Sequence, residues 1–241
     1  FLDVETIPLK NWLKDGFLKI KTREVFFPYK YIDGIWGKTY FESKTFFEKI
    51  LRDCVYGRKG KKTIPGLIVK KNVFYKNFFE NVRAGEDAEW IKKNNKKKYI
   101  LETKSKILYY GLINLSFAGS VKKWLRNYYH SANLQYLKNQ KKIYLIILFL
   151  TIVFVFNSIN FLFLNVHLNF YNIFIYLSFC SYFIIRSIVL PMFNGVDFFS
   201  VFPIRFIFIG IVGLILDATK FTAFILSNFN FNDKIEALKI K

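Results

Sequence analysis

The sequence is poor in the residues that usually build redox and metal sites: it has two cysteines, two histidines and one methionine in 241 residues. Cys54 lies in a polar region and Cys180 in the middle of an apolar run, and neither has a metal-ligand partner at a useful spacing. His130 and His167 are equally isolated. These absences exclude a disulfide framework and a cysteine- or histidine-based metal centre, and they indicate free thiols in a reducing compartment or in lipid.

Acidic residues are also scarce, with 17 Asp and Glu against 37 Lys and Arg. Residues 1–140 carry 29 Lys and Arg against 13 Asp and Glu, whereas residues 141–241 carry 8 against 4. No compact basic recognition motif is present, so we expect no nucleic-acid partner. A basic half followed by an apolar half predicts a domain that lies against anionic membrane lipids.

The apolar half is long enough to cross a bilayer more than once. Residues 143–164 contain no charge and would form a helix of about 33 Å. Residues 170–190 form a second span, in which Arg186 lies near one end and is expected to snorkel to the interface. Residues 204–226 form a third, weaker candidate that either crosses the membrane or lies in the interface.

Charged residues also set the expected orientation. Asp217 and Lys220 interrupt the third segment at i and i+3, where they are expected to pair. Lysines precede the first span, and the 165–169 connection has no Lys or Arg. The positive-inside rule therefore predicts a multi-pass membrane protein with residues 1–141 in the cytoplasm. Within the same scheme, residues 122–141 form a basic and aromatic interfacial segment, 142–228 the transmembrane region and 229–241 a polar tail.

Residues 1–121 alternate between helical and extended patterns, which predicts an α/β domain. The expected helices are 9–20, 39–56, 73–79 and 86–95. The expected strands are 24–32, 67–69 and 99–101, with a Pro-Gly turn at 64–66. The basic stretch 57–62 is expected to be a mobile loop, either a solvated charge run or a contact for phosphate or lipid headgroups.

Two acidic pairs stand out on this basic domain. In an extended segment Asp3 and Glu5 share a face, which suits a hard divalent cation with oxygen ligands. Glu86 and Asp87 open a predicted helix, where the helix dipole favours their ionised form. Such a carboxylate can be a helix cap or a general base. Taken alone, acidic pairs of this kind are usually caps or solvated turn residues.

The order of these motifs is informative. Phe1-Leu2-Asp3-Val4-Glu5 with Pro8 and Trp12-Leu13, then Ile64-Pro65-Gly66, Lys70-Lys71-Asn72-Val73-Phe74 and Gly85-Glu86-Asp87-Ala88-Glu89-Trp90, resembles the family 2 glycosyltransferases of the GT-A fold. The resemblance covers about residues 1–130. It implies that residues 1–121 are the C-terminal portion of a Rossmann-like GT-A domain, whose nucleotide-binding strands would precede residue 1.

The resemblance also assigns roles. Asp3 and Glu5 would hold Mg²⁺ or Mn²⁺ on the donor diphosphate, and Asp87 would be the base that activates the acceptor, with Glu86 beside it. Contacts with the donor diphosphate or the acceptor would come from Gly66, Trp90 and Arg126.

The resulting hypothesis is an inverting transfer from a nucleotide-diphosphate sugar to a lipid-linked or polysaccharide acceptor at the cytoplasmic face. A sugar hydroxyl would need a base such as Asp87, whereas a polyprenyl phosphate is already anionic and would need none. The alternative is a non-catalytic membrane protein whose basic domain docks anionic lipid or a partner subunit.

Overall fold

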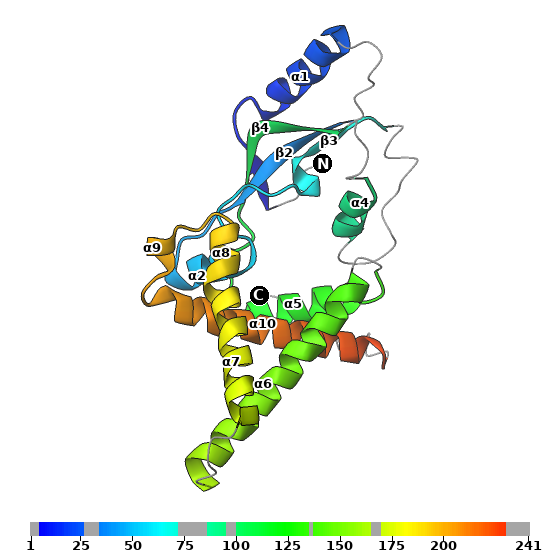
Figure 1. The fold of residues 1–241 in the computed structure, drawn as a ribbon. Helices are drawn as coiled ribbons and strands as arrows, with labels where there is room; N and C mark the ends of the chain where they lie inside the picture. The colour runs from blue at the N-terminus through cyan, green and yellow to red at the C-terminus, as the bar shows by residue number, and fades with distance from the viewer. Residues whose placement is uncertain are drawn as a thin grey trace.

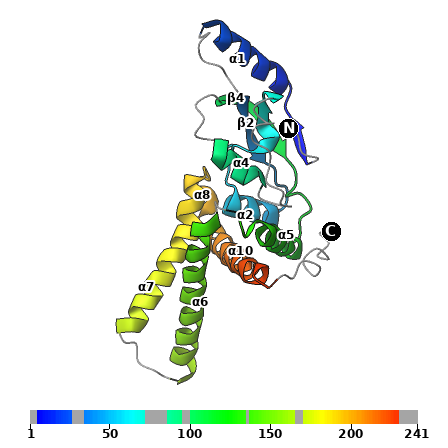
Figure 2. The same ribbon diagram turned by 90° about the vertical axis from the view of Figure 1, so that its right-hand side faces the viewer.

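The computed structural model describes residues 5–26, 34–71, 86–94, 100–134, 137–164 and 170–229. These residues form an α/β unit followed by a long helical hairpin and a further long helix (Figures 1 and 2). The α/β class predicted from the sequence is therefore confirmed. The predicted helix at 73–79 lies outside the described residues.

A small mixed sheet with the strand order β1-β4-β2-β3 forms the centre of the α/β unit. Its strands are β1 (Thr6–Pro8), β2 (Gly34–Phe41), β3 (Leu67–Val69) and β4 (Ile100–Tyr109). The two central strands, β2 and β4, are parallel, while β1 and β3 pair antiparallel with them at the edges. The predicted strand at 67–69 is confirmed, and the one predicted at 99–101 is the beginning of the longer β4.

Helices surround the sheet at both ends of the unit: α1 (Trp12–Phe26), α2 (Phe46–Val55), the short η1 (Ile64–Gly66), α4 (Glu86–Asn94) and α5 (Phe117–Ser131). Both views place α1 at the end of the sheet far from the hairpin and α2 and α5 on the side towards it (Figures 1 and 2). The predicted helices at 9–20 and 86–95 are confirmed with shifted ends.

Two predictions for the first 60 residues are wrong. The strand expected at 24–32 is contradicted at its first three residues, which belong to α1, and residues 27–32 lie outside the described residues. The helix expected at 39–56 is divided, because residues up to Phe41 belong to β2 and α2 begins only after Thr45. Thr45 and Glu48 form a capping box that fixes this start, since each side chain accepts a hydrogen bond from the other's backbone N–H.

The basic stretch 57–62 is anchored, which corrects the expectation of a mobile loop. The backbone N–H groups of Arg58 and Lys59 donate to the carbonyl oxygen of Asn194 at 3.0 and 2.9 Å. The Lys59 ammonium donates to the carbonyl oxygen of Phe193 at 2.8 Å. Gly57 has φ of +72°, and a Cβ at this position would lie 2.4 Å from the Asn194 carbonyl oxygen. A glycine is required here because the loop approaches the Asn194 backbone so closely.

The apolar half forms α6 (Lys138–Leu164), α7 (Phe170–Ile184), the π-helical turn η3 (Ile185–Val189), α8 (Leu190–Phe193), α9 (Phe198–Val201) and α10 (Arg205–Ser227). By length and composition, three of the described helical segments can cross a membrane: 140–161, 170–193 and 205–227. The predicted interfacial segment 122–141 is divided between the end of α5 and the start of α6.

The third of these helices differs from the other two. Figure 1 shows α10 running across α6 and α7, and Figure 2 shows it beside the end of α6 nearest the sheet. Of its apolar stretch, 56% is buried, compared with 0% for α6 and 11% for α7 and its continuation. The largest core cluster accordingly joins α10 to α2 and α5, with Leu51, Trp124 and Leu216 among its members.

Candidate functional site

Glu5 is held at the beginning of β1, beside the end of β4. Its carbonyl oxygen accepts a hydrogen bond from the N–H of Tyr110 at 2.8 Å, and its Oε2 accepts one from the Tyr109 hydroxyl at 2.6 Å. The ammonium of Lys123 on α5 lies 3.4 Å from the same hydroxyl. Glu5 is exposed, and within the described residues its Oε1 has no hydrogen-bond donor. That oxygen is therefore available to a cation or to a ligand.

Asp87 lies in the first turn of α4, half-buried, and its Oδ1 accepts a hydrogen bond from the N–H of Ala88 at 2.7 Å. The positive end of the helix dipole stabilises a carboxylate in this position. Glu86 begins the helix, but the placement of its side chain lies outside what the structure describes.

Trp90 holds α4 against the sheet. Its side chain is 2% exposed and meets Trp36 of β2 edge to face, with ring centroids 6.1 Å apart. Ile64 and Leu67 complete this second core cluster. A ring this deeply buried has no face left to stack on a sugar. The packing role expected of Trp90 is therefore the one that these contacts support.

The other two predicted contacts lie on different elements. Gly66 is buried at the end of η1, where an added Cβ would lie 3.3 Å from the carbonyl oxygen of Gly37 in β2. It therefore permits the close approach of η1 to the sheet. Arg126 is half-buried on α5, the helix that also carries Lys123. Asp3, the second predicted metal ligand, lies outside the described residues.

Tyr56, which the sequence analysis did not single out, connects these elements. It follows α2, stacks on Phe41 with ring centroids 3.8 Å apart and lies 6.4 Å from the ring of Trp124. Burial raises the pKa of the Tyr56 hydroxyl, and so do the neighbouring Tyr128 and the charges of Asp87 and Glu5. Tyr56 thus joins the end of β2 to α5.

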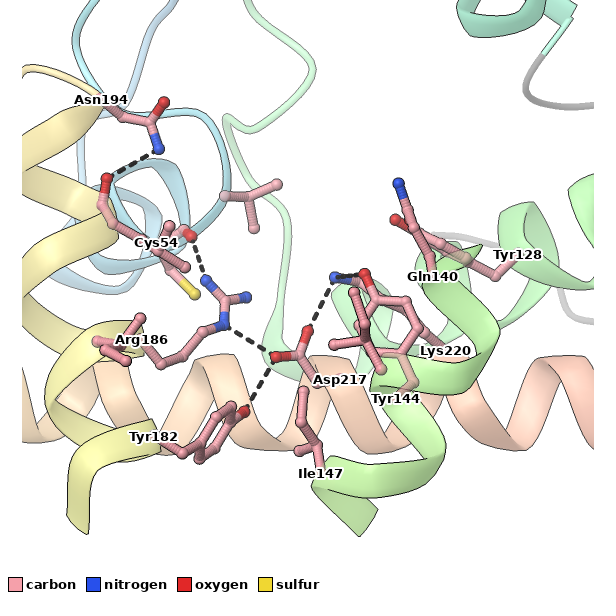
Figure 3. A pocket seen from close by; sticks show the side chains of 14 residues that line it. Cys54, Tyr128, Gln140, Tyr144, Ile147, Tyr182, Arg186, Asn194, Asp217 and Lys220 are labelled. Atoms are coloured by element: carbon pink, nitrogen blue, oxygen red, sulfur yellow. Dashed lines mark hydrogen bonds and ion pairs between the residues drawn. The ribbon is translucent and has the colours of Figure 1, made fainter. Parts of the chain in front are cut away.

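A cavity of about 480 Å³ lies between α6, α7 and α10 and extends to the end of α2 (Figure 3). Its walls include polar side chains that the fold brings together from distant positions: Tyr128, Gln140, Tyr144, Tyr182, Arg186, Asp217 and Lys220. The predicted pairing of Asp217 with Lys220 is confirmed at 2.9 Å.

Arg186 is the residue whose role the sequence analysis missed. It was expected to snorkel, but it is 8% exposed and donates from Nε to Asp217 Oδ2 at 3.0 Å. Its Nη1 also donates to the carbonyl oxygen of Cys54 at 2.8 Å. Tyr182 donates to the same Asp217 oxygen at 3.0 Å. The sequence did contain a signal for this pair, because Arg186 lies in the second apolar segment and Asp217 in the third. Isolated charges in apolar segments usually pair with one another.

The described residues contain no group of three His, Cys, Asp and Glu side chains that could hold a metal ion. In comparisons with protein-family models, curated proteins and solved structures, no significant match to the chain was found.

Proposed function

We propose that the protein is a membrane-bound inverting glycosyltransferase that moves a sugar from a nucleotide-diphosphate donor to a lipid-linked or glycan acceptor at the cytoplasmic face. The observation that carries the proposal is the position of Glu5 beside the end of β4, where Tyr109 donates to Oε2 and no described residue donates to Oε1. In the motif order of family 2 glycosyltransferases, a metal-binding acid stands at the position of Glu5 and the acceptor base at the position of Asp87. An exposed carboxylate oxygen suits the first role, and the first turn of α4 stabilises the carboxylate needed for the second.

The donor side of the site consists of Glu5 and, from the sequence, Asp3. Oε1 of Glu5, to which no described residue donates a hydrogen bond, suits a hard divalent cation, for which the donor phosphates would supply further oxygen ligands. When bound, Mg²⁺ or Mn²⁺ would neutralise the charge that develops on the departing diphosphate. The hydrogen bond from Tyr109 orients the Glu5 carboxylate, and Lys123 lies against the same tyrosine hydroxyl.

On the acceptor side, Asp87 is the base for a hydroxyl acceptor. The acceptor oxygen attacks the anomeric carbon while the bond from that carbon to the diphosphate oxygen breaks. The acceptor proton passes to Asp87, and the nucleoside diphosphate leaves. Because this is a single in-line displacement, the configuration at the anomeric carbon is inverted.

For the membrane, we infer that α6 and α7 cross the bilayer and that α10 lies along its cytoplasmic surface. α10 packs lengthwise against α5, which carries Lys122, Lys123 and Arg126. If α10 crossed the bilayer, these charges would be drawn towards the hydrocarbon at a cost of several kcal/mol. The exposed apolar side chains of α10, including Phe208 and Ile211, would instead face lipid.

The test is donor binding by the full-length protein in lipid nanodiscs. Nucleotide-diphosphate sugars are titrated with and without Mn²⁺, using the wild type, Glu5→Gln and the exposed control Asp15→Asn. We expect cation-dependent binding that Glu5→Gln weakens and Asp15→Asn leaves unchanged. If no donor binds in either condition, the transferase proposal fails and the non-catalytic alternative, a domain that docks lipid or a partner subunit, replaces it.

A further inference from the structure

The cavity between α6, α7 with its continuation η3, and α10 is referred to as the wedge. Figure 1 shows α10 running across α6 and α7. The lining of the wedge combines polar groups with apolar side chains such as Ile143 and Ile185. Those two side chains are exposed on the faces of the candidate spans. A group that enters between the helices would therefore come from the lipid side.

The charge in the wedge is positive. Arg186 and Lys220 both bind the single carboxylate of Asp217, at 3.0 and 2.9 Å, which leaves a net charge of +1 among the three. Figure 3 shows Asp217 between the two cations, with Arg186 extending from η3, the continuation of α7, and Lys220 from α10. A low-dielectric site with one uncompensated positive charge favours an anionic ligand.

Both cations retain donors that a ligand can use. Within the described residues, Nη2 of Arg186 has no acceptor, since Nε binds Asp217 and Nη1 binds the Cys54 carbonyl oxygen. The Lys220 ammonium lies 3.3 Å from the Tyr144 hydroxyl and 5.0 Å from the centre of that ring. A guanidinium, an ammonium and tyrosine hydroxyls around one space form the donor set that recognises a phosphate.

We propose that this wedge binds the phosphate of an anionic lipid, with Arg186 and Lys220 contacting the phosphate oxygens and the acyl or prenyl chain leaving between α6 and α7. Tyr144 donates to the same phosphate from α6. Lipid binding stands on the geometry of the wedge alone. The further step, that the bound lipid is the acceptor, rests on the proposed function.

The first experiment measures lipid retention by native mass spectrometry of the full-length protein. The probes are phosphatidic acid, a polyprenyl phosphate and, as the zwitterionic reference, phosphatidylcholine. We expect the two phosphate monoester lipids to bind and phosphatidylcholine to be displaced. Arg186→Gln and Lys220→Gln each lower the affinity for the anionic lipids by about tenfold or more. Lys142→Gln, an exposed lysine of α6 outside the cavity, leaves the affinity unchanged.

Asp217→Asn separates ligand binding from a purely structural role of the network. Removing the carboxylate raises the net charge of the wedge, so we expect tighter binding of the anionic lipids. The melting temperature of this variant should fall in phosphatidylcholine and recover in phosphatidic acid. If the network only holds the helices together, all three substitutions lower the melting temperature and no anionic lipid restores it, which overturns the proposal.

Two further experiments test whether the bound phosphate belongs to a lipid and whether lipid binding depends on the proposed transfer reaction. Inorganic phosphate at millimolar concentration should not displace phosphatidic acid, because it lacks the apolar chain. If it does, the wedge is a soluble-anion site and the lipid assignment is wrong. Lipid retention by the Asp87→Asn variant should equal that of the wild type. If the wild-type protein binds no nucleotide-sugar donor but still retains anionic lipid, the transferase proposal is refuted and the lipid site is supported.

Discussion

Arg186 of η3 donates a hydrogen bond from Nε to Oδ2 of Asp217 in α10 at 3.0 Å, linking two apolar segments through charged groups that are both less than one-tenth exposed. Charges in such surroundings are strongly destabilising unless they are paired and hydrogen-bonded. The pair therefore fixes α10 against the end of α7. Gly213 lies beside it, where an added Cβ would be 2.9 Å from Nε of Arg186.

Close packing of α10 on α7 depends on a second glycine. A Cβ on Gly210 would lie 2.3 Å from the ring of Phe183, so Gly210→Ala must displace that ring. We expect a loss of about 1–3 kcal/mol, seen as a lower melting temperature in detergent. Ala218→Gly, on the same helix, is the control for helix propensity alone and costs about 1 kcal/mol. Restoration of stability by Phe183→Leu in the Gly210→Ala background would confirm the contact.

Trp90→Ala is expected to detach α4 from the sheet. The substitution removes a fully buried indole from the cluster with Trp36, at a cost of about 3–5 kcal/mol. Hydrogen exchange of the amides in residues 86–94 should accelerate. Lys92→Ala, on the exposed face of the same helix, should leave exchange nearly unchanged. Equal protection in the two variants would contradict the packing role of Trp90.

Glu48 makes the stability of the protein acid-sensitive. Burial opposes its ionisation, but hydrogen bonds from the backbone N–H groups of Lys44, Asn114 and Thr45 outweigh it and lower the Glu48 pKa from 4.5. The stabilisation is therefore complete above about pH 4.5 and is lost as the pH falls through the lowered value. We expect Glu48→Gln to lose about 1–3 kcal/mol at pH 7.

The difference in melting temperature between the wild type and Glu48→Gln should shrink as the pH is lowered below about 4.5. Asp15→Asn, an exposed substitution on α1, provides the baseline. A pH-independent difference would show that the carboxylate charge contributes nothing.

Asp87→Asn tests the base. Loss of a positioned general base typically lowers turnover by about 10²–10⁴-fold. We expect a loss in this range for transfer to a hydroxyl acceptor, with donor binding unchanged because Glu5 is intact. Near-normal turnover with a polyprenyl phosphate as acceptor would instead assign the reaction to the acceptor that needs no base. Near-normal turnover with a sugar hydroxyl would remove Asp87 from the mechanism.

Single cysteines test the placement of α10 in a Cys180→Ser background, since Cys54 is buried. If α10 lies on the surface, Phe229→Cys after its end and Lys122→Cys on α5 react with an impermeant maleimide from the same side. Phe170→Cys, at the far end of the hairpin, reacts from the other side. Labelling of Phe229→Cys together with Phe170→Cys would mean that α10 crosses.

Sequence alone was enough for features whose cause is local. The lengths of the apolar helices follow from uninterrupted runs of apolar residues, and α4 begins at Glu86 because the acidic turn favours a helix N-terminus there. The pairing of Asp217 with Lys220 follows from their i,i+3 spacing on one helix. β2 escaped prediction because its first four residues are all buried, so it has no alternating pattern to reveal it.

Tertiary structure decided the contacts between distant segments. Hydropathy marks α10 as long and apolar enough to cross a bilayer, but it does not reveal that 56% of its apolar stretch is buried in the protein. Both a spanning helix and a helix buried in a protein need apolar faces of similar length. The burial of Arg186 depends on an acid 31 positions away and on a glycine that admits its side chain. The stacking of Tyr56 on Phe41 likewise depends on how the end of α2 lies against β2. The sequence shows where each of these residues stands in the chain, but only the packing of distant segments determines which side chains contact one another.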